Sequence, residues 1–212
     1  MTVHPLEVYH ILDGHYGALN WWPAESPYEM VVGAVLTQNT NWRNVEKAID
    51  RLKARDCLNP RDILNMDAEE LAELIRPAGF HKQKAGYIHN LTSWFVNYDG
   101  QALPMERIRK ELLAIKGIGQ ETADCILVYA LELPSFVIDA YTMRIFGRLG
   151  LVLKGYNAYQ NHFHAHLPRD VALYNQYHAL IVQHAKIHCT KSNPSCTTCP
   201  LNQICPFYGG KH

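Results

Sequence analysis

The chain has 212 residues, of which 48% are hydrophobic and 19% are charged, as expected for a globular protein that buries its own core. Twenty basic residues balance twenty acidic ones, which excludes a strong global attraction to nucleic acid or anionic membranes. No apolar run is long enough to cross a membrane, and the start, MTVHPLEVYH, lacks the features of a secretion signal. We therefore expect a cytoplasmic protein without membrane contact, which binds its partners through local patches.

The first part of the chain has apolar residues spaced three and four apart, which predicts helices. The residues Ser26 to Glu29 resemble a capping box with Pro27 at the first helical position, so a helix should run through MVVGAVLTQ. Asn41 is expected to cap the next helix, and Asp67 the helix in DAEELAELIRP. The same pattern continues to the end of the chain, and the predicted fold class is all-α.

The second part continues with a helix in MERIRKELLAI after Pro104, a turn that contains glycine, and a helix in ETADCILVYALEL. Pro134 should interrupt the chain. Asp139 is expected to begin a helix through YTMRIFGRLGL, and a last long helix should span about residues 170 to 187.

The turn in LLAIKGIGQETA is the first candidate binding site. Gly117 and Gly119 allow backbone conformations that a side chain would forbid, and their amides can converge where the next helix begins. Free amides at a helix start bind anions, most simply a phosphate group. The alternative is an ordinary helix connector, but the apolar runs on both sides fit a helix-hairpin-helix better. The other motifs of the chain, described below, are what favour DNA phosphate as the anion.

The last 24 residues contain four cysteines in the pattern Cys189-x6-Cys196-x2-Cys199-x5-Cys205. Four thiolates in one short loop suit either zinc or an iron-sulfur cluster, and ligand chemistry alone does not choose between them. Two short C-x2-C knuckles would favour zinc, whereas this segment has only one. Two further cysteines, Cys57 and Cys125, are interpreted as structural.

Three motifs in order, IKGIGQETA, VIDAYTMRIFGRLG and the cysteine spacing, resemble the endonuclease III superfamily of helix-hairpin-helix DNA glycosylases. The resemblance runs from about Tyr28 to Cys205. It implies a two-lobed all-α fold, with one lobe at 24–135 and the other at 1–23 plus 136–212, closed by a [4Fe-4S] loop at 189–205. It also implies a double-stranded DNA partner with a damaged base, and we expect a monomer. The cluster ligands would be Cys189, Cys196, Cys199 and Cys205.

By this resemblance, Asp139 is the catalytic aspartate. A plain helix cap is an equally good interpretation, and both can hold, because a carboxylate kept ionised by backbone amides can also stabilise a sugar cation. Gln38, with Asn39 beside it, matches the residue that fills the gap left in the duplex, and Phe80 matches the wedge on the other strand. The resemblance assigns the contact with DNA phosphate to Lys116, Gly117 and Gly119.

Glu121 occupies the position at which bifunctional members of the superfamily carry a lysine. That lysine attacks the sugar and cleaves the strand through a Schiff base. A carboxylate cannot form an imine, so lyase activity should be absent. Two interpretations of Glu121 stay open: it complements the helix dipole in the first turn, or it takes a direct part in catalysis.

The motifs WWP, GAVLTQNT, RPAGF and KGIG-x-E are most similar to the 3-methyladenine DNA glycosylase branch (third type) of the superfamily. This similarity implies a base pocket formed by Trp21, Trp22, Pro23 and Trp42. Packing between domains is the alternative role of the tryptophans. The chain departs from the best-known protein of this branch, which lacks the cysteine cluster.

The resulting prediction is a monofunctional glycosylase that hydrolyses alkylated purines such as 3-methyladenine from DNA and leaves an abasic site. A methylated base is positively charged and its glycosidic bond is weak, so stacking between electron-rich rings can supply recognition. One alternative is an endonuclease III-like enzyme for oxidised pyrimidines or mismatched bases, with AP lyase activity or without it. Another is a non-catalytic DNA-binding or redox-sensing iron-sulfur protein.

Overall fold

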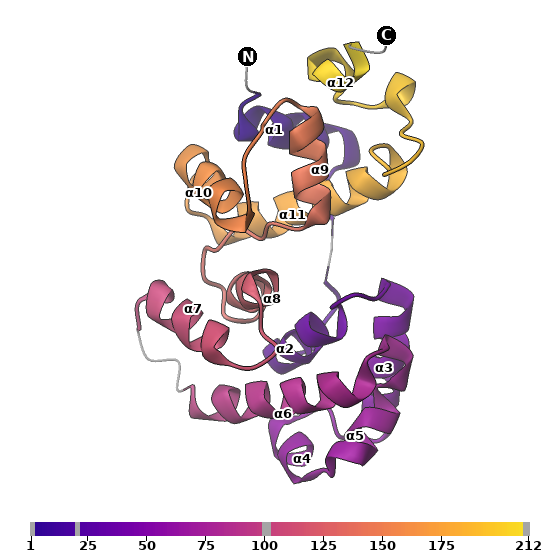
Figure 1. The fold of residues 1–212 in the computed structure, drawn as a ribbon, viewed down its shortest axis with the longest axis vertical. Coiled ribbons are helices and arrows are strands. Elements are labelled where there is room, and N and C mark those ends of the chain that lie inside the picture. Colours follow the sequence, from indigo (N-terminus) through magenta and orange to yellow (C-terminus); the bar gives the residue numbers. More distant parts are fainter. Residues whose placement is uncertain (1–2, 20–21, 99–102, 210–212) are drawn as a thin grey trace. The chain divides into compact units, whose positions relative to one another are not determined.

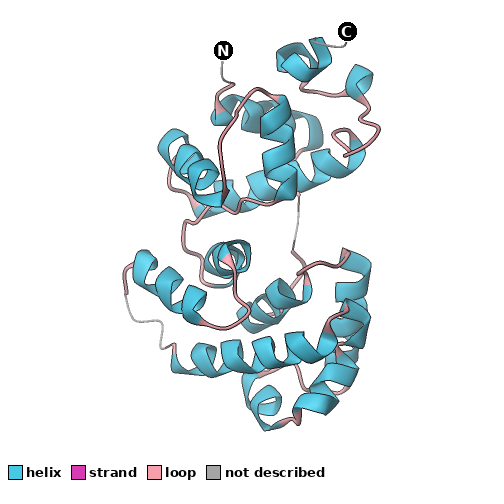
Figure 2. Ribbon diagram, in the orientation of Figure 1, coloured by secondary structure: helices cyan, strands magenta, loops and turns pink. Residues whose placement is uncertain are grey.

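The computed structural model describes residues 3–19, 22–98 and 103–209, and these residues form helices and loops without a strand (Figure 2). The chain divides into two compact units (Figure 1). Trp22–Leu133 forms one, here called the middle unit, and Met1–Trp21 with Pro134–His212 forms the other, the terminal unit. The all-α prediction is confirmed for the described residues. None of their helices is long and apolar enough to cross a membrane.

The middle unit is a bundle around the buried helix α2 (Pro27–Leu36), which packs against α3, α6 and η2. Its other elements, in chain order, are α3 (Trp42–Ala54), α4 (Pro60–Asn65), α5 (Ala68–Leu74), the 3-10 turn η1 (Arg76–Ala78), α6 (His81–Asn97), α7 (Met105–Ala114), α8 (Gln120–Cys125) and the π-helical turn η2 (Ile126–Ala130).

Three helices of this unit begin where the sequence predicts. The Oγ of Ser26 accepts a hydrogen bond of 3.1 Å from the backbone N–H of Glu29, and Pro27 is the first helical residue. Asn41 caps α3 and Asp67 caps α5 through the same kind of bond. Each cap satisfies a backbone N–H that has no partner within its helix.

The helix predicted in ETADCILVYALEL changes form halfway. After α8, residues 126–130 widen into a π-helical turn, in which the N–H of Leu131 bonds to the carbonyl of Ile126 at 3.1 Å. Every residue of this turn is buried, so its backbone groups must find partners inside the protein. The extended segment from Pro134 onward then leads into the terminal unit.

The terminal unit is built on the long helix α11 (Val171–Ile187), which packs against α1 and α9. Rings of Phe136, Phe163, Tyr174 and Tyr177 contact one another in its core. The remaining elements are α1 (Pro5–Tyr16), α9 (Ala140–Arg148), α10 (Tyr156–His166), the 3-10 turns η3 (Cys196–Thr198) and η4 (Asn202–Ile204), and α12 (Pro206–Gly209).

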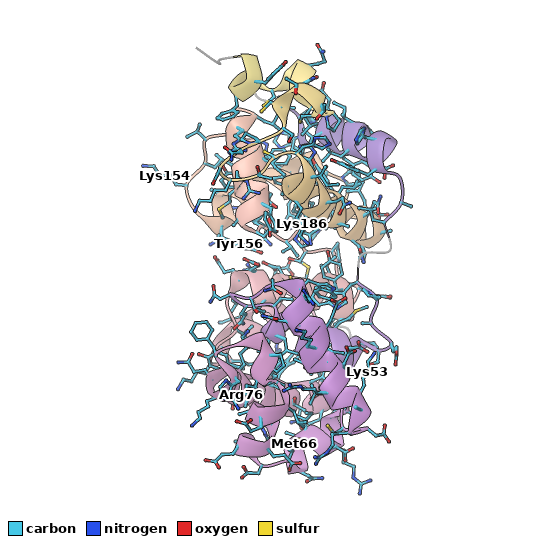
Figure 3. All side chains as sticks on the ribbon, turned by 90° about the vertical axis from the view of Figure 1, so that its right-hand side faces the viewer. Lys53, Met66, Arg76, Lys154, Tyr156 and Lys186 are labelled. Carbon is cyan, nitrogen blue, oxygen red and sulfur yellow. The ribbon has the colours of Figure 1, made fainter. Side chains whose placement is uncertain are left out.

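Side chains of α10 hold the extended segment that leads into α9. Gln160 donates a hydrogen bond of 2.9 Å to the carbonyl of Phe136, and the Nε2 of His164 accepts one from the N–H of the same residue at 3.0 Å. The hydroxyl of Tyr156, labelled in Figure 3, accepts a bond from the N–H of Ile138. Because these bonds replace those of a strand partner, the backbone just before Asp139 is fixed.

Candidate active site

The hairpin between α7 and α8 is a tight turn that accepts only glycine at its centre. Gly117 has a φ of +92°, and a Cβ at this position would lie 2.2 Å from the Cγ of Tyr87 in α6. Tyr87 therefore packs directly on the backbone of the turn. Lys116 and Gly119 are exposed on either side, and Ile118 is buried beneath. The exposed face of the turn is available to a ligand.

A buried ion pair fixes the two helices of the hairpin. Arg109 of α7 donates from Nε and Nη2 to the two carboxylate oxygens of Asp124 in α8, at 2.8 and 2.9 Å. Asp124 is fully buried, so this fork-shaped contact replaces the water that the carboxylate loses. Sequence analysis missed this pair, because nothing in the spacing of the two residues marks them as partners.

Gln38 contacts the hairpin directly. Its Nε2 donates hydrogen bonds of 3.0 Å to the carbonyl of Gly117 and to the Oγ1 of Thr122. Asn39 follows it, exposed and in the left-handed conformation with a φ of 51°. The structure thus brings Gln38 and the hairpin together, although they are far apart in the sequence.

Phe80 projects from the start of α6. Its side chain is 63% exposed, and its backbone is left-handed with a φ of 47°, directly after Gly79 at 68°. Considered alone in the sequence, a phenylalanine would be expected in the core. The structure instead places this ring at the surface of the middle unit, on a turn with a strained backbone.

Tryptophan rings line a cavity of about 200 Å³ in the middle unit. Trp22 packs on Gly33 of α2, and its ring meets that of Trp42 edge-on, with 5.6 Å between the ring centroids. Pro23 lines the same cavity, so three of the four predicted pocket residues lie together. The fourth, Trp21, lies outside the described residues.

The wall of this cavity carries more negative than positive groups, which sequence analysis did not foresee. Glu29, Glu46 and Asp50 line it, and Lys53, labelled in Figure 3, is the one cation among the described residues of this wall. Glu29 is only 6% exposed and pairs with Lys53 at 3.0 Å, while Lys53 also reaches Glu25 at 2.9 Å. Since Lys53 is already paired, the remaining carboxylates favour a ligand with positive charge.

Asp139 begins α9 in the terminal unit, and its role as a helix cap is confirmed. Its Oδ1 accepts bonds from the N–H and the hydroxyl of Thr142, at 2.7 and 2.8 Å. Its Oδ2 lies 3.5 Å from the Nε2 of His178 in α11, and the residue is 8% exposed. Burial would raise the pKa of Asp139, but His178 and the bonds from Thr142 outweigh it and hold the pKa below its usual range. The carboxylate is therefore ionised at neutral pH.

His178 is a residue that sequence analysis missed. A single histidine on an apolar helix carries no pattern that links it to a carboxylate elsewhere in the chain. Glu121, by contrast, lies as expected in the first turn of α8, where its side chain is exposed. This position suits a carboxylate that complements the helix dipole.

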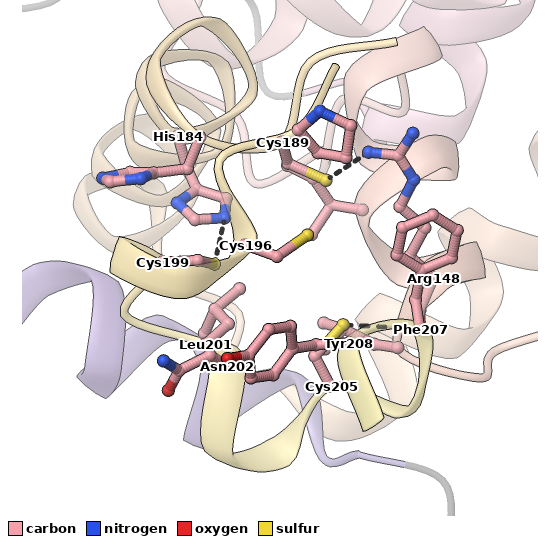
Figure 4. A pocket seen from close by; sticks show the side chains of 14 residues that line it. Arg148, His184, Cys189, Cys196, Cys199, Leu201, Asn202, Cys205, Phe207 and Tyr208 are labelled. Carbon is pink, nitrogen blue, oxygen red and sulfur yellow. Dashed lines mark hydrogen bonds between the residues drawn. The ribbon is translucent and has the colours of Figure 1, made fainter. Parts of the chain in front are cut away.

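All four cysteines of the C-terminal segment line one small cavity (Figure 4). Arg148 donates from Nη1 to the Sγ of Cys189 at 3.1 Å and to the carbonyl of Thr190 at 2.8 Å. The pKa of Cys199 is raised to about 11, mainly by burial and in part by the other three thiols, against a hydrogen bond with the backbone of Leu201 that lowers it. Four thiolates this close together would repel one another. A cationic metal group bound between them would offset that repulsion. Among the described residues, no three side chains already stand at metal-ligand geometry.

Comparison with protein families gives one match over most of the chain. A model of the HhH-GPD superfamily of base excision DNA repair proteins matches residues 32–168. A protein of Methanocaldococcus jannaschii named as a DNA repair glycosylase is 48% identical over 208 residues, which cover 94% of each chain. Endonuclease III of Thermotoga maritima is 29% identical, over 86% of this chain and 84% of its own.

Solved structures agree with this match. The 3-methyladenine DNA glycosylase MagIII of H. pylori, bound to 1,N6-ethenoadenine, superposes with a TM-score of 0.76 at 29% identity, over 87% of this chain and 98% of its own. An endonuclease III in a trapped covalent complex with DNA gives a TM-score of 0.81 at 22% identity, over 98% of each chain, a likeness of fold alone.

Proposed function

Because the chain belongs to the HhH-GPD superfamily of base excision DNA repair proteins and is a DNA glycosylase of that superfamily, we propose that it removes alkylated purines such as 3-methyladenine from double-stranded DNA. The products would be the free base and an abasic site. The carrying observation is the tryptophan-lined cavity with its excess of carboxylates, since an alkylated purine is a flat cation. An uncharged oxidised pyrimidine would gain little from such a wall.

In this proposal, the damaged base leaves the duplex and stacks against Trp22 and Trp42, with Pro23 in the same pocket. Asp139 supplies the negative charge that stabilises the sugar as the glycosidic bond breaks and the sugar becomes cationic. The bonding electrons leave with the base, and water adds to the anomeric carbon and loses a proton. His178 helps to keep the carboxylate of Asp139 ionised. A general acid is not needed, because the alkylated base already carries a positive charge before it leaves.

The hairpin would hold the DNA backbone. Amides around Gly117 and Gly119 can bind phosphate, with Lys116 beside them, while Phe80, Gln38 and Asn39 enter the duplex. We propose that the protein acts as a monomer, with all of these groups on one chain. Because Glu121 stands in place of the lyase lysine, hydrolysis should occur without strand cleavage.

A second candidate is the removal of oxidised pyrimidines. The likeness to endonuclease III and the four clustered cysteines favour it. The aromatic cavity and Glu121 favour alkylated purines instead, and comparison of the two DNA substrates separates the candidates.

Trp42→Leu should lower kcat/KM for the release of 3-methyladenine by roughly 10- to 100-fold, because one stacking ring contributes about 1–3 kcal/mol. Release of free base is measured by chromatography of methylated duplex DNA. The matched control is Trp94→Leu, which removes a tryptophan that stacks on Tyr98 and does not line the cavity. Equal losses in the two variants would show that the cavity does not receive the base.

We also propose that Cys189, Cys196, Cys199 and Cys205 hold a [4Fe-4S] cluster, supported by their shared cavity and by the cation of Arg148 beside them. When bound, the cluster would cross-link the loop after α11 and take no part in base removal. Arg148 would orient the loop through its bonds to Cys189 and Thr190.

Cys199→Ser should therefore lose iron and acid-labile sulfide and lower the free energy of unfolding by on the order of 3 kcal/mol, because ligand binding contributes to folding. Metal analysis and thermal unfolding measure both effects. Cys57→Ser is the control, since Cys57 is a buried thiol of the middle unit. The assignment would be contradicted if the wild type contained no iron, or if Cys199→Ser contained as much iron as the wild type.

A further inference from the structure

Lys84 is a buried lysine whose side chain joins two loops of the middle unit. It lies in α6, and only 2% of its surface is exposed. Its Nζ donates hydrogen bonds of 2.9 Å to the carbonyl oxygens of Leu36 and of Ala78. These two residues are the last of α2 and of η1, so one ammonium group bonds to the final carbonyls of two helical segments.

Placing an ammonium group there has a cost. Burial lowers the pKa of Lys84 to about 8, which means that the protein interior disfavours the charged form. An unbranched apolar side chain such as methionine could fill the same space without desolvating a charge. The lysine is therefore explained by its two hydrogen bonds rather than by packing.

Both loops that start at these carbonyls contain a strained residue. Asn39 in one and Phe80 in the other have left-handed backbones, with φ values of 51° and 47°. Such conformations cost about 1 kcal/mol or more for residues other than glycine, and they persist only where the surroundings hold them. The backbone N–H of Lys84 also bonds to the carbonyl of Phe80 at 3.0 Å. Lys84 thus contacts the Phe80 loop twice.

We propose that Lys84 is a positioning residue that fixes the loop of Gln38 and Asn39 to the loop of Phe80, so that both loops enter the DNA duplex as one wedge. The inference rests on the proposed function, which assigns duplex opening to these side chains. Gln38 is anchored at its tip by the hairpin, and Lys84 anchors the start of the same loop. The exposed ring of Phe80 has its loop tied to the same ammonium group.

The test compares a paired with an unpaired damaged base. A wedge matters only where the base must be separated from its partner, so Lys84→Met should slow single-turnover release from a fully paired duplex by roughly 10- to 100-fold. Release from the same DNA with an abasic-site analogue opposite the damaged base should slow less than about threefold. Equal slowing of both substrates would overturn the proposal, because a general structural role predicts it.

Two controls isolate the effect. Lys47→Met removes an exposed lysine from α3 of the same unit, and it should release base from both substrates at wild-type rates. Leu71→Ala removes a fully buried side chain from α5 and weakens the unit while it leaves Lys84 and its two hydrogen bonds in place. It should affect both substrates in the same proportion. If Leu71→Ala also slowed only the paired substrate, the proposal would fail.

Hydrogen exchange tests the inference independently of the enzyme's substrate. In Lys84→Met, amides of residues 37–40 and 79–82 should exchange faster, with smaller changes in the rest of the middle unit. A uniform increase across the unit would overturn the positioning role even if base release is observed. A wild type that releases no base would instead refute the proposed function. If Lys84→Met does not fold, Lys84→Gln, a shorter neutral donor, is measured in the same way.

The lowered pKa gives a further check on the buried ammonium. Between pH about 8 and ~10.4, the unfolded chain binds more protons at Lys84 than the folded one, so stability rises with pH in this window. The free energy of unfolding of the wild type relative to Lys84→Met should therefore increase from pH 8 to pH 10, as measured by chemical denaturation. A difference that is flat over this range would contradict a buried charged lysine.

Discussion

Asp139→Asn should abolish base release, with a loss of roughly 10³-fold or more in single-turnover rate, while the protein folds and binds DNA as the wild type does. The amide oxygen of asparagine can still accept the bonds from Thr142 that cap α9, so the helix start is kept. What is lost is the negative charge that would stabilise the cationic sugar. Single-turnover release of 3-methyladenine and a binding assay with abasic-site DNA measure the two properties separately.

The matched control for this variant is Asp170→Asn. Asp170 caps α11 through a bond of 2.7 Å to the N–H of Leu173, so the substitution makes the same chemical change at another helix start. Base release by Asp170→Asn should equal that of the wild type. If Asp139→Asn also released base at the wild-type rate, Asp139 would be a helix cap only, and the proposed reaction would lose its catalytic group.

Gly117→Ala should have the second largest effect, on the folded structure and on DNA binding together. The new Cβ would lie 2.2 Å from the ring of Tyr87, at a φ of +92° that alanine avoids. Left-handed strain alone costs about 1–2 kcal/mol, and the displacement of Tyr87 adds to it. We expect the free energy of unfolding to fall by about 2 kcal/mol or more, and the affinity for duplex DNA to fall at least about tenfold as the hairpin amides move.

Gly119→Ala is the control at the other glycine of the turn. A Cβ there meets no protein atom within 4 Å, and the φ of −90° suits any residue. Its free energy of unfolding should change by less than about 1 kcal/mol. Chemical denaturation of both variants measures the difference. Equal losses at the two glycines would mean that the clash with Tyr87 does not set the shape of the hairpin.

Local signals made much of the fold predictable from the sequence. Ser26, Asn41, Asp67 and Asp139 all cap helices as expected, because a cap depends on a side chain and an N–H only two or three residues away. The all-helical class followed from apolar spacing alone. The π-helical turn at 126–130 was not predicted, because a fully buried apolar run has the same composition in either form of helix.

The contacts of the candidate site needed the tertiary structure. His178 beside Asp139, and Lys84 between two loops, are single residues whose partners lie far away in the sequence. The position of a lone polar residue on an apolar helix does not identify the distant residue that it contacts. The acidic wall of the tryptophan cavity was missed for the same reason, since Glu46 and Asp50 look like the ordinary exposed face of α3.

Motif resemblance supplied roles that physical reasoning on the sequence could not. The superfamily itself is shown by the match over residues 32–168, whereas the roles of Gln38, Phe80 and Glu121 stay predictions. The exposure of Phe80 and the contact of Gln38 with the hairpin support those roles without testing them.

The most direct test of the account is base release by the purified protein from methylated duplex DNA, run beside a thymine-glycol duplex with borohydride present to trap any covalent intermediate. The account predicts free 3-methyladenine and no trapped adduct, because Glu121 cannot form an imine. A trapped adduct on thymine glycol, with no release of methylated base, would contradict it and identify a bifunctional enzyme for oxidised pyrimidines that uses another amine.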